Sequence, residues 1–281
     1  MTAVRSRLGW LLWPITVVAV LGHLGLGVLA VVELVRLDWL TSEPYEFTAV
    51  GVVAGSALLA VAGALQVGRP AVRGHRAIRR LLRSAGRPLP QPARAAADTL
   101  GLAGRVDVVV AGEAFAVTHG LLRPRILLST GLIRALDTPE LTAVLVHERH
   151  HLQARDPLRL LATRVVAGYG WYLPLLRWWA QRLALRRELA ADRAATARAG
   201  VAAVAGALLK LADLPASAAV AAVNPAGNLP ERIAQLEGQP PTRRTRLGWL
   251  LAGATLANLA GLSAAAVCCA GLGVAMTGSM T

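Results

Sequence analysis

The chain has 281 residues, of which 55% are hydrophobic and only 16% are charged, and its mean hydropathy is +0.50. These values differ from those of ordinary soluble domains and favour a membrane protein. The formal net charge of +14 comes almost wholly from arginine, with Lys210 as the only lysine, so the candidate partners are anionic: nucleic acid or membrane lipid.

Three segments are long and apolar enough to cross a bilayer. None carries a formal charge, and each meets the roughly 20 residues that a hydrocarbon core of about 30 Å requires. They cover residues 8–32, 48–67 and 247–276. The first is too long for the apolar region of a signal peptide and lacks a clear cleavage site, so we expect a membrane anchor there.

The charges around the second segment predict the orientation of the chain. Residues 33–47 carry four acidic groups and one arginine, whereas arginine dominates residues 69–94. By the positive-inside rule, the N-terminus and the region after the second segment lie in the cytoplasm. We therefore expect a membrane region over residues 1–67, a cytoplasmic domain over 68–246, and a last transmembrane helix with a short tail over 247–281.

The arginines after the second segment form one stripe on a predicted helix, because they alternate at spacings of four and three residues. The stripe comprises Arg69, Arg73, Arg76, Arg80, Arg83 and Arg87. Beside a membrane span, such a stripe favours contact with anionic lipid. No nucleic-acid-binding motif accompanies it, so we expect no direct binding of DNA or RNA.

A small antiparallel sheet is predicted between this helix and residue 130. Its strands are three β-prone runs separated by glycine-containing turns, at residues 105–110, 114–118 and 126–128.

The next helix carries the pattern H-E-x-x-H. Asp137 or Thr138 is the predicted N-cap, and the Asp156-Pro157 step is expected to end or kink the helix. His147 and His151 are four residues apart and share one helix face, so they can bind one metal ion together. Glu148 lies next to that face, where a zinc-dependent hydrolase needs its general base.

Two histidines leave tetrahedral zinc one protein ligand short. Glu188 is the candidate third ligand, and Asp192 lies one turn further along the same predicted helix. A carboxylate at Asp192 could orient a ligating histidine through its free N–H group. The alternative is a solvated helix held by pairs of opposite charges, which the upstream motif makes less favourable.

Residues 158–180 are also apolar, but too few residues separate the H-E-x-x-H motif from Glu188 for two membrane crossings. A single crossing would separate Glu188 from His147. We therefore expect helices that lie at the membrane interface or against the catalytic core.

These motifs together resemble the BlaR/MecR-type membrane zinc metallopeptidases, which are gluzincins related to HtpX and CAAX-protease-like enzymes. The resemblance covers roughly residues 105–238 and rests on the following runs: Leu121-Leu122-Arg123-Pro124-Arg125-Ile126-Leu127-Leu128-Ser129, Leu145-Val146-His147-Glu148-Arg149-His150-His151, Arg155-Asp156-Pro157 and Arg187-Glu188-Leu189-Ala190-Ala191-Asp192.

The resemblance implies roles for individual residues. It assigns His147, His151 and Glu188 as ligands of one Zn²⁺ ion, Glu148 as the catalytic base, and Asp192 as an orienting group. Relatives hold an extended peptide on an edge strand beside the zinc, which corresponds here to Ala114, Phe115, Ala116 and Val117; a plain hairpin packed on the helix explains the same residues equally well. Arg232 matches a recurrent arginine of relatives, although a structural ion pair also accounts for it.

The expected protein is thus an α+β membrane protein, mostly helical, with three transmembrane helices and a gluzincin-like metalloprotease domain. The resemblance places it in the bacterial plasma membrane and implies cleavage of a BlaI/MecI-like transcriptional repressor. Alternatives are HtpX-like quality control of membrane proteins, or a catalytically silent zinc-binding scaffold. The β-lactam sensors of this family continue into a penicillin-binding domain, which we do not expect in a chain that ends at Thr281.

Overall fold

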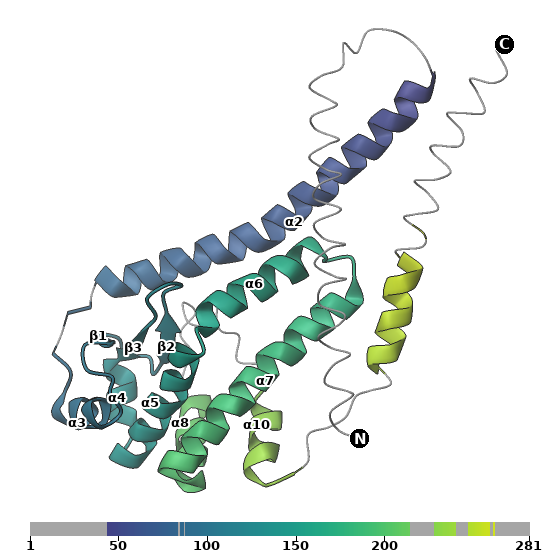
Figure 1. Cartoon of the computed structure of the whole chain (residues 1–281). Coiled ribbons are helices and arrows are strands. Elements are labelled where there is room, and N and C mark those ends of the chain that lie inside the picture. The colour runs from purple at the N-terminus through teal and green to yellow at the C-terminus, as the bar shows by residue number, and fades with distance from the viewer. Residues whose placement is uncertain are drawn as a thin grey trace. The chain divides into compact units, whose positions relative to one another are not determined.

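The computed structural model describes residues 44–83, 85–86, 88–213, 228–239, 247–258 and 261 (Figure 1). These residues form a mostly helical α+β protein with one small sheet. The chain divides into two compact units, the second of which consists of Arg69–Thr163 and Ala180–Arg243. All of the candidate site residues belong to this second unit.

Regular elements follow one another with short connections up to residue 213. They are α2 Pro44–Arg83, α3 Gln91–Thr99, β1 Val106–Val109, β2 Ala116–His119, β3 Arg125–Ser129, α4 Thr130–Ala135, α5 Thr138–Gln153, α6 Asp156–Tyr169, α7 Pro174–Ala199, α8 Val201–Asp213 and, further on, α10 Leu229–Leu236.

The sheet is mixed, not wholly antiparallel as the sequence had suggested. Its strand order is β1-β3-β2, with β3 parallel to β1 and antiparallel to β2. The physical reason lies in β3, where Ile126, Leu127 and Leu128 are all fully buried. A strand that is apolar on both faces is best placed in the centre of a sheet, which leaves β1 and β2 as its two edges.

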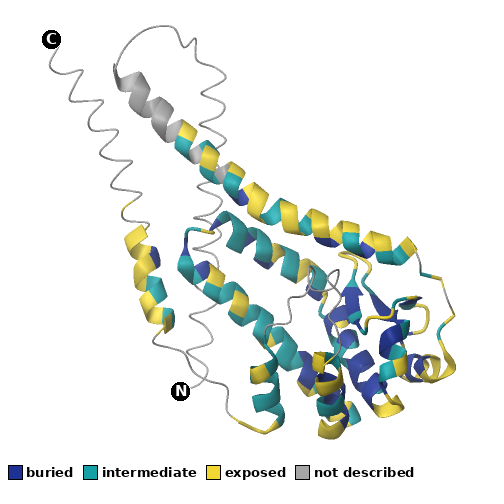
Figure 2. Ribbon diagram, turned by 180° about the vertical axis from the view of Figure 1, so that it is seen from behind, coloured by how far each residue is buried: buried dark blue, intermediate teal, exposed yellow. Residues whose placement is uncertain are grey.

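Alternating side chains of the sheet face two different helical layers. Ile126 and Leu128 pack into the main core, which α3, α5 and α8 complete. Leu127 faces the other way and packs in the cluster that contains Ile78 of α2. Burial is accordingly concentrated in the sheet and the helices that cover it (Figure 2). The H-E-x-x-H helix α5 is therefore held directly against the sheet.

Both ends of α5 are fixed locally. Asp137 is the N-cap: its Oδ1 accepts a hydrogen bond of 2.8 Å from the Glu140 amide, and Glu140 Oε2 accepts one of 2.9 Å from the Asp137 amide. Such a cap is worth about 1 kcal/mol. At the other end, Arg155 adopts a positive φ of 52°, and α6 begins at Asp156. The chain thus leaves α5 in a sharp turn one residue before Asp156.

The described part of the first unit comprises residues 44–68, 164–179 and 247–258. Glycines allow its helices to approach closely: a Cβ atom at Gly63 would lie 2.8 Å from Cδ1 of Tyr169. The Oγ1 atom of Thr255 accepts a hydrogen bond of 3.2 Å from the Leu175 amide. Residues 170–173 form a turn between α6 and α7, so the apolar run over 158–180 is two helices and not one.

Within the described residues, no helix combines the length and the apolar character that a bilayer crossing requires. The predicted span over residues 8–32 and most of that over 247–276 lie outside the described residues. Residues 48–67 are helical as part of α2.

Candidate metal centre

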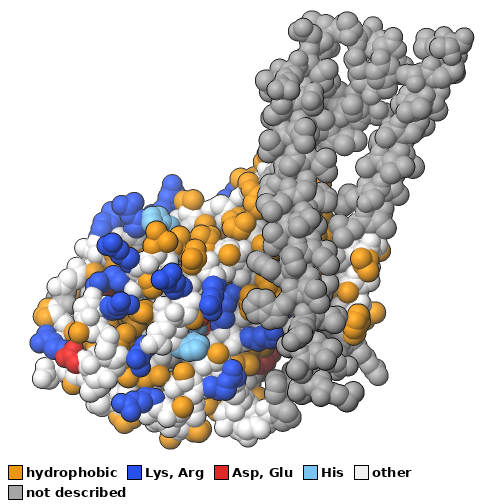
Figure 3. All heavy atoms as spheres, in the orientation of Figure 1, with side chains coloured by type: hydrophobic (Ala, Val, Ile, Leu, Met, Phe, Trp, Pro, Cys, Tyr) orange, Lys and Arg blue, Asp and Glu red, His pale blue; other side chains and the backbone are white. Residues whose placement is uncertain are grey.

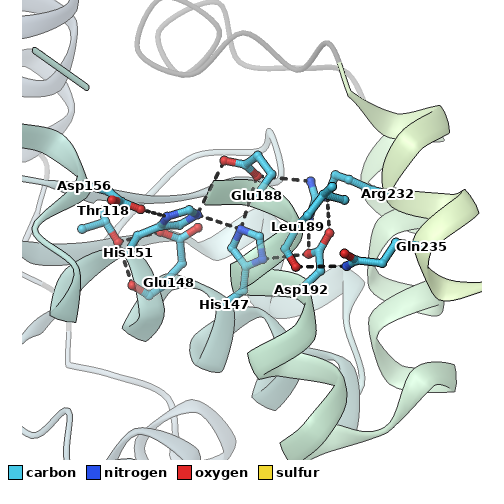
Figure 4. A network of polar contacts seen from close by, with 10 residues as sticks. All are labelled: Thr118, His147, Glu148, His151, Asp156, Glu188, Leu189, Asp192, Arg232 and Gln235. Carbon is cyan, nitrogen blue, oxygen red and sulfur yellow. Dashed lines mark hydrogen bonds and ion pairs between the residues drawn. The ribbon is translucent and has the colours of Figure 1, made fainter. Parts of the chain in front are cut away.

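His147 and His151 lie one turn apart on α5 and point toward the same spot (Figure 4). Their Nε2 atoms are 3.0 Å apart, and both side chains are largely shielded from solvent. This arrangement follows from the helical spacing, since residues four apart share one face.

Glu188 reaches the same spot from α7. Its Oε2 atom is 3.5 Å from Nε2 of His147, and its Oε1 atom is 3.6 Å from Nε2 of His151. One ligand atom from each of the three residues lies within 4.8 Å of the other two. The structure therefore brings together the three side chains that the sequence suggested as metal ligands.

Two further carboxylates orient the histidine rings. Asp192 Oδ1 is 2.9 Å from Nδ1 of His147, and Asp156 Oδ2 is 2.7 Å from Nδ1 of His151. A carboxylate can only accept, so each Nδ1 carries a hydrogen, and in the neutral form of each ring the Nε2 atom presents its lone pair to the centre. Asp192 was a predicted orienting group, whereas Asp156 was interpreted only as part of a helix end.

Arg232 on α10 pairs with the fully buried Asp192. Its Nε atom donates to Oδ2 at 2.6 Å and its Nη2 atom to Oδ1 at 2.7 Å, and Nη1 lies 3.6 Å from Glu188 Oε2. A second contact holds α10 in place, because Gln235 Nε2 donates to the Leu189 carbonyl at 3.0 Å. The ion pair compensates a charge that would otherwise be costly to bury.

The electrostatic field of the site favours a cation. Burial opposes the charge on His147, but hydrogen bonds to Asp192 and Glu188 overcome this effect and raise its pKa to about 9. Burial likewise opposes the charges on Glu188 and Asp192, yet His147 and Arg232 lower the pKa of each carboxyl to about 2. Both carboxylates are therefore ionised at neutral pH beside the two imidazoles.

The donor set fits zinc. With both Nδ1 atoms donating to carboxylates, the neutral rings present two Nε2 lone pairs beside the Glu188 carboxylate, and a metal ion would take the place of the proton that the raised pKa of His147 retains. Two nitrogens at about 2.05 Å from a tetrahedral ion are roughly 3.3 Å apart, which is close to the observed 3.0 Å. Two histidines and one glutamate are also the ligands of one class of catalytic zinc sites.

Glu148 is buried beside His151 and is held by a residue that the sequence gave no reason to select. Thr118 Oγ1 donates to Glu148 Oε2 at 2.7 Å and lies 3.1 Å from the Glu148 carbonyl oxygen. Thr118 belongs to β2, so the edge strand directly contacts the candidate base.

The predicted peptide-binding segment only partly coincides with an edge strand. Ala116 and Val117 are the first residues of β2, whereas Ala114 and Phe115 precede it. The backbone of Phe115 already forms hydrogen bonds within the protein and is not free to pair with a peptide. Its amide donates to Ser129 Oγ and its carbonyl accepts from the Ser129 amide, both at 3.0 Å. The backbone that remains on the outer edge of the sheet therefore belongs to β2 itself.

The remaining described histidines stand apart from the cluster of ligand atoms. His119 lies 3.9 Å from Asp107, and burial lowers its pKa. His150 directly precedes His151 on α5 and points roughly 100° away from it around the helix axis, and its ring centroid is 6.3 Å from that of His151.

Removing the Asp156 carboxylate should weaken metal binding without removing a ligand. Asp156→Ala is expected to lower zinc affinity about 10- to 100-fold, because the ring of His151 loses the group that fixes its orientation. Competition with a chromophoric chelator measures this affinity. Asp98→Ala, at an exposed carboxylate of α3, is the control; equal affinities in both variants would contradict the prediction.

Comparison with known families identifies the region that contains these residues. Residues 112–236 match the family model described as BlaR1 peptidase M56, and all three candidate ligands, Glu148 and Arg232 fall within the match. No curated protein matches the chain. The resemblance to this metallopeptidase family is thereby confirmed for residues 112–236.

Proposed function

Because residues 112–236 are an M56 metallopeptidase domain, we propose that the chain is a membrane-embedded zinc metalloendopeptidase that cleaves protein substrates. One observation carries the proposal: His147, His151 and Glu188 converge as a metal-binding triad, with the Glu148 carboxylate beside them. A site that only stabilised the fold would need a fourth protein ligand in place of an adjacent base.

Each of these side chains would have a separate role in peptide hydrolysis. His147, His151 and Glu188 would hold the ion, which when bound supplies a Lewis acid for hydrolysis. Glu148 takes the proton from the attacking water and passes it to the leaving amine. Asp192 and Asp156 keep the two imidazoles in the required tautomer, and Arg232 keeps Asp192 ionised.

We propose that an extended segment of the substrate pairs with the outer edge of β2. Two observations support this: β2 is an edge strand with one paired neighbour among the described strands, and its residue Thr118 contacts Glu148. Backbone hydrogen bonds along an edge strand bind peptides with little dependence on sequence. The scissile bond would then lie close to the metal ligands.

The substrate can be sought in cells that express wild type or Glu148→Gln. New protein N-termini that occur only with wild type identify the products. A fragment of a BlaI/MecI-like repressor would support regulated proteolysis, and fragments of many misfolded membrane proteins would support quality control. Identical sets of N-termini would indicate a scaffold and contradict the proposed function.

The localisation is also a proposal: the N-terminus and the metallopeptidase domain lie in the cytoplasm of a bacterial cell, as the distribution of arginine favours. Introduced cysteines test it in a chain without Cys268 and Cys269. An impermeant thiol reagent added to intact cells should label Ser42→Cys and not Ala197→Cys, which lies at an exposed position of α7; the reverse pattern would contradict this orientation.

Anionic lipid is the proposed partner of the arginine stripe. Arg69, Arg73, Arg76, Arg80 and Arg83 are all exposed, and none of them pairs with a carboxylate in the described part of the chain. Basic side chains cover this part of α2 (Figure 3). Arg87, the last member, lies outside the described residues.

Reversing three of these charges should weaken the binding of anionic lipid. A variant with Arg73→Glu, Arg76→Glu and Arg80→Glu is expected to need at least about 100-fold more phosphatidylglycerol for half-maximal thermal stabilisation in detergent, because each arginine contributes about 1 kcal/mol. A matched variant with Arg94→Glu, Arg105→Glu and Arg134→Glu, at exposed positions outside the stripe, should behave as wild type. Equal shifts in both would show that net charge alone matters.

A further inference from the structure

Thr118 is the only described side chain that hydrogen-bonds the carboxylate of Glu148. Its hydroxyl is 2.7 Å from Oε2 and 3.1 Å from the backbone oxygen of the same residue, and both side chains are buried, with 8% of each residue exposed. The contact joins residues 30 positions apart, from an edge strand to the H-E-x-x-H helix.

The hydroxyl of Thr118 has a single hydrogen, so it serves one of these two acceptors at a time. The contact to the side-chain oxygen Oε2, at 2.7 Å, is shorter than the contact to the backbone oxygen, at 3.1 Å. The backbone oxygen of Glu148 already lies within the hydrogen-bonding pattern of α5. The hydrogen is therefore donated mainly to Oε2.

A glutamate side chain has three rotatable bonds, and a general base must hold its oxygen within about 2.6–3.2 Å of the proton that it abstracts. Fixing Oε2 removes most of this freedom and leaves Oε1 as the oxygen available for proton transfer. A catalytic group that is already oriented before the reaction begins raises the rate of the chemical step.

We propose that Thr118 is a positioning residue, which holds the Glu148 carboxylate in the orientation required for proton transfer. The proposal rests on the proposed peptidase function. Among the described residues, Thr118 forms no hydrogen bond with His147, His151 or Glu188, and it acts only through Glu148. Its place on β2 means that the strand proposed to bind substrate also sets the position of the base.

The test compares two substitutions in the full-length, zinc-loaded protein. Thr118→Val keeps the shape of the side chain and removes the donor, whereas Thr118→Ser keeps the donor. We expect Thr118→Val to lower kcat about 10- to 100-fold, as the loss of a hydrogen bond to a charged group implies. KM and zinc content should stay within about twofold of wild type, because neither substrate binding nor a ligand is altered. Thr118→Ser should restore most of kcat.

Thr196→Val is the matched control. It also replaces threonine with valine in the second compact unit, but at a buried hydroxyl that has no hydrogen-bond partner in the described part of the chain. Its kcat should equal that of wild type. Thr118→Ala, which lacks the donor in a smaller side chain, provides a second variant and should repeat the loss of kcat.

Three outcomes would overturn the proposal. They are a kcat of Thr118→Val equal to that of wild type, a loss of bound zinc in both donor-free variants, and an equal loss of kcat in Thr118→Ser. Failure of the proposed peptidase function would give a different result. In that case neither the zinc-loaded wild type nor Glu148→Gln would cleave any peptide or protein.

Discussion

A His147→Ala/His151→Ala variant is expected to purify without zinc, whereas the wild-type chain is expected to bind one ion. The two substitutions remove both Nε2 donors and leave Glu188 as the only member of the triad. A single carboxylate completes no tetrahedral site and competes poorly with water for the ion. Elemental analysis of protein purified in parallel measures the zinc-to-protein ratio. Equal ratios in the two proteins would remove the basis of the proposed function.

Two controls separate loss of ligands from loss of fold. His150→Ala changes the residue beside His151 but removes no atom of the triad, so it should keep one ion per chain. Wild type treated with a chelator should lose its ion and recover it when zinc is restored. The double variant should remain empty after the same treatment, with a circular dichroism spectrum that still reports a helical protein.

The metal ligands could be predicted from sequence because their geometry is local. His147 and His151 are four residues apart on one capped helix, and Glu188 and Asp192 repeat that spacing on another. Helical periodicity alone places each pair on one face. That the two faces meet is a tertiary fact, which no spacing rule predicts. It was suggested by the third protein ligand that two histidines leave zinc without and by the resemblance to a known family, and the structure now describes it.

Asp156 and Thr118 could not be predicted in this way. Asp156 reaches His151 because Arg155 adopts a positive φ, which is an unusual conformation for a residue with a side chain. The sequence around Pro157 predicted a helix end but not the direction of the chain after it. Thr118 is 30 residues from Glu148, and no spacing rule connects a strand residue to a particular residue of a later helix.

The direction of the strands was wrong for a related reason. Short strands joined by turns suggested an antiparallel sheet, yet β1 pairs with the more distant β3 in parallel orientation. The uninterrupted apolar run Ile126-Leu127-Leu128 was the available signal, since a strand buried on both faces belongs in the centre of a sheet. Alternation of polar and apolar residues would instead have indicated a strand with one face exposed to solvent.

Glu148→Gln is expected to lower peptidase activity by at least about 1,000-fold and to leave zinc content unchanged. The amide has nearly the same shape as the carboxylate, and its oxygen can still accept the hydrogen bond from Thr118. It cannot accept a proton at neutral pH, so the attacking water loses its base while the metal ligands stay in place. Initial cleavage rates of a defined product, measured at equal zinc occupancy, report the effect. Loss of zinc together with activity would assign Glu148 to the binding of the ion, and activity within tenfold of wild type would show that another group acts as the base.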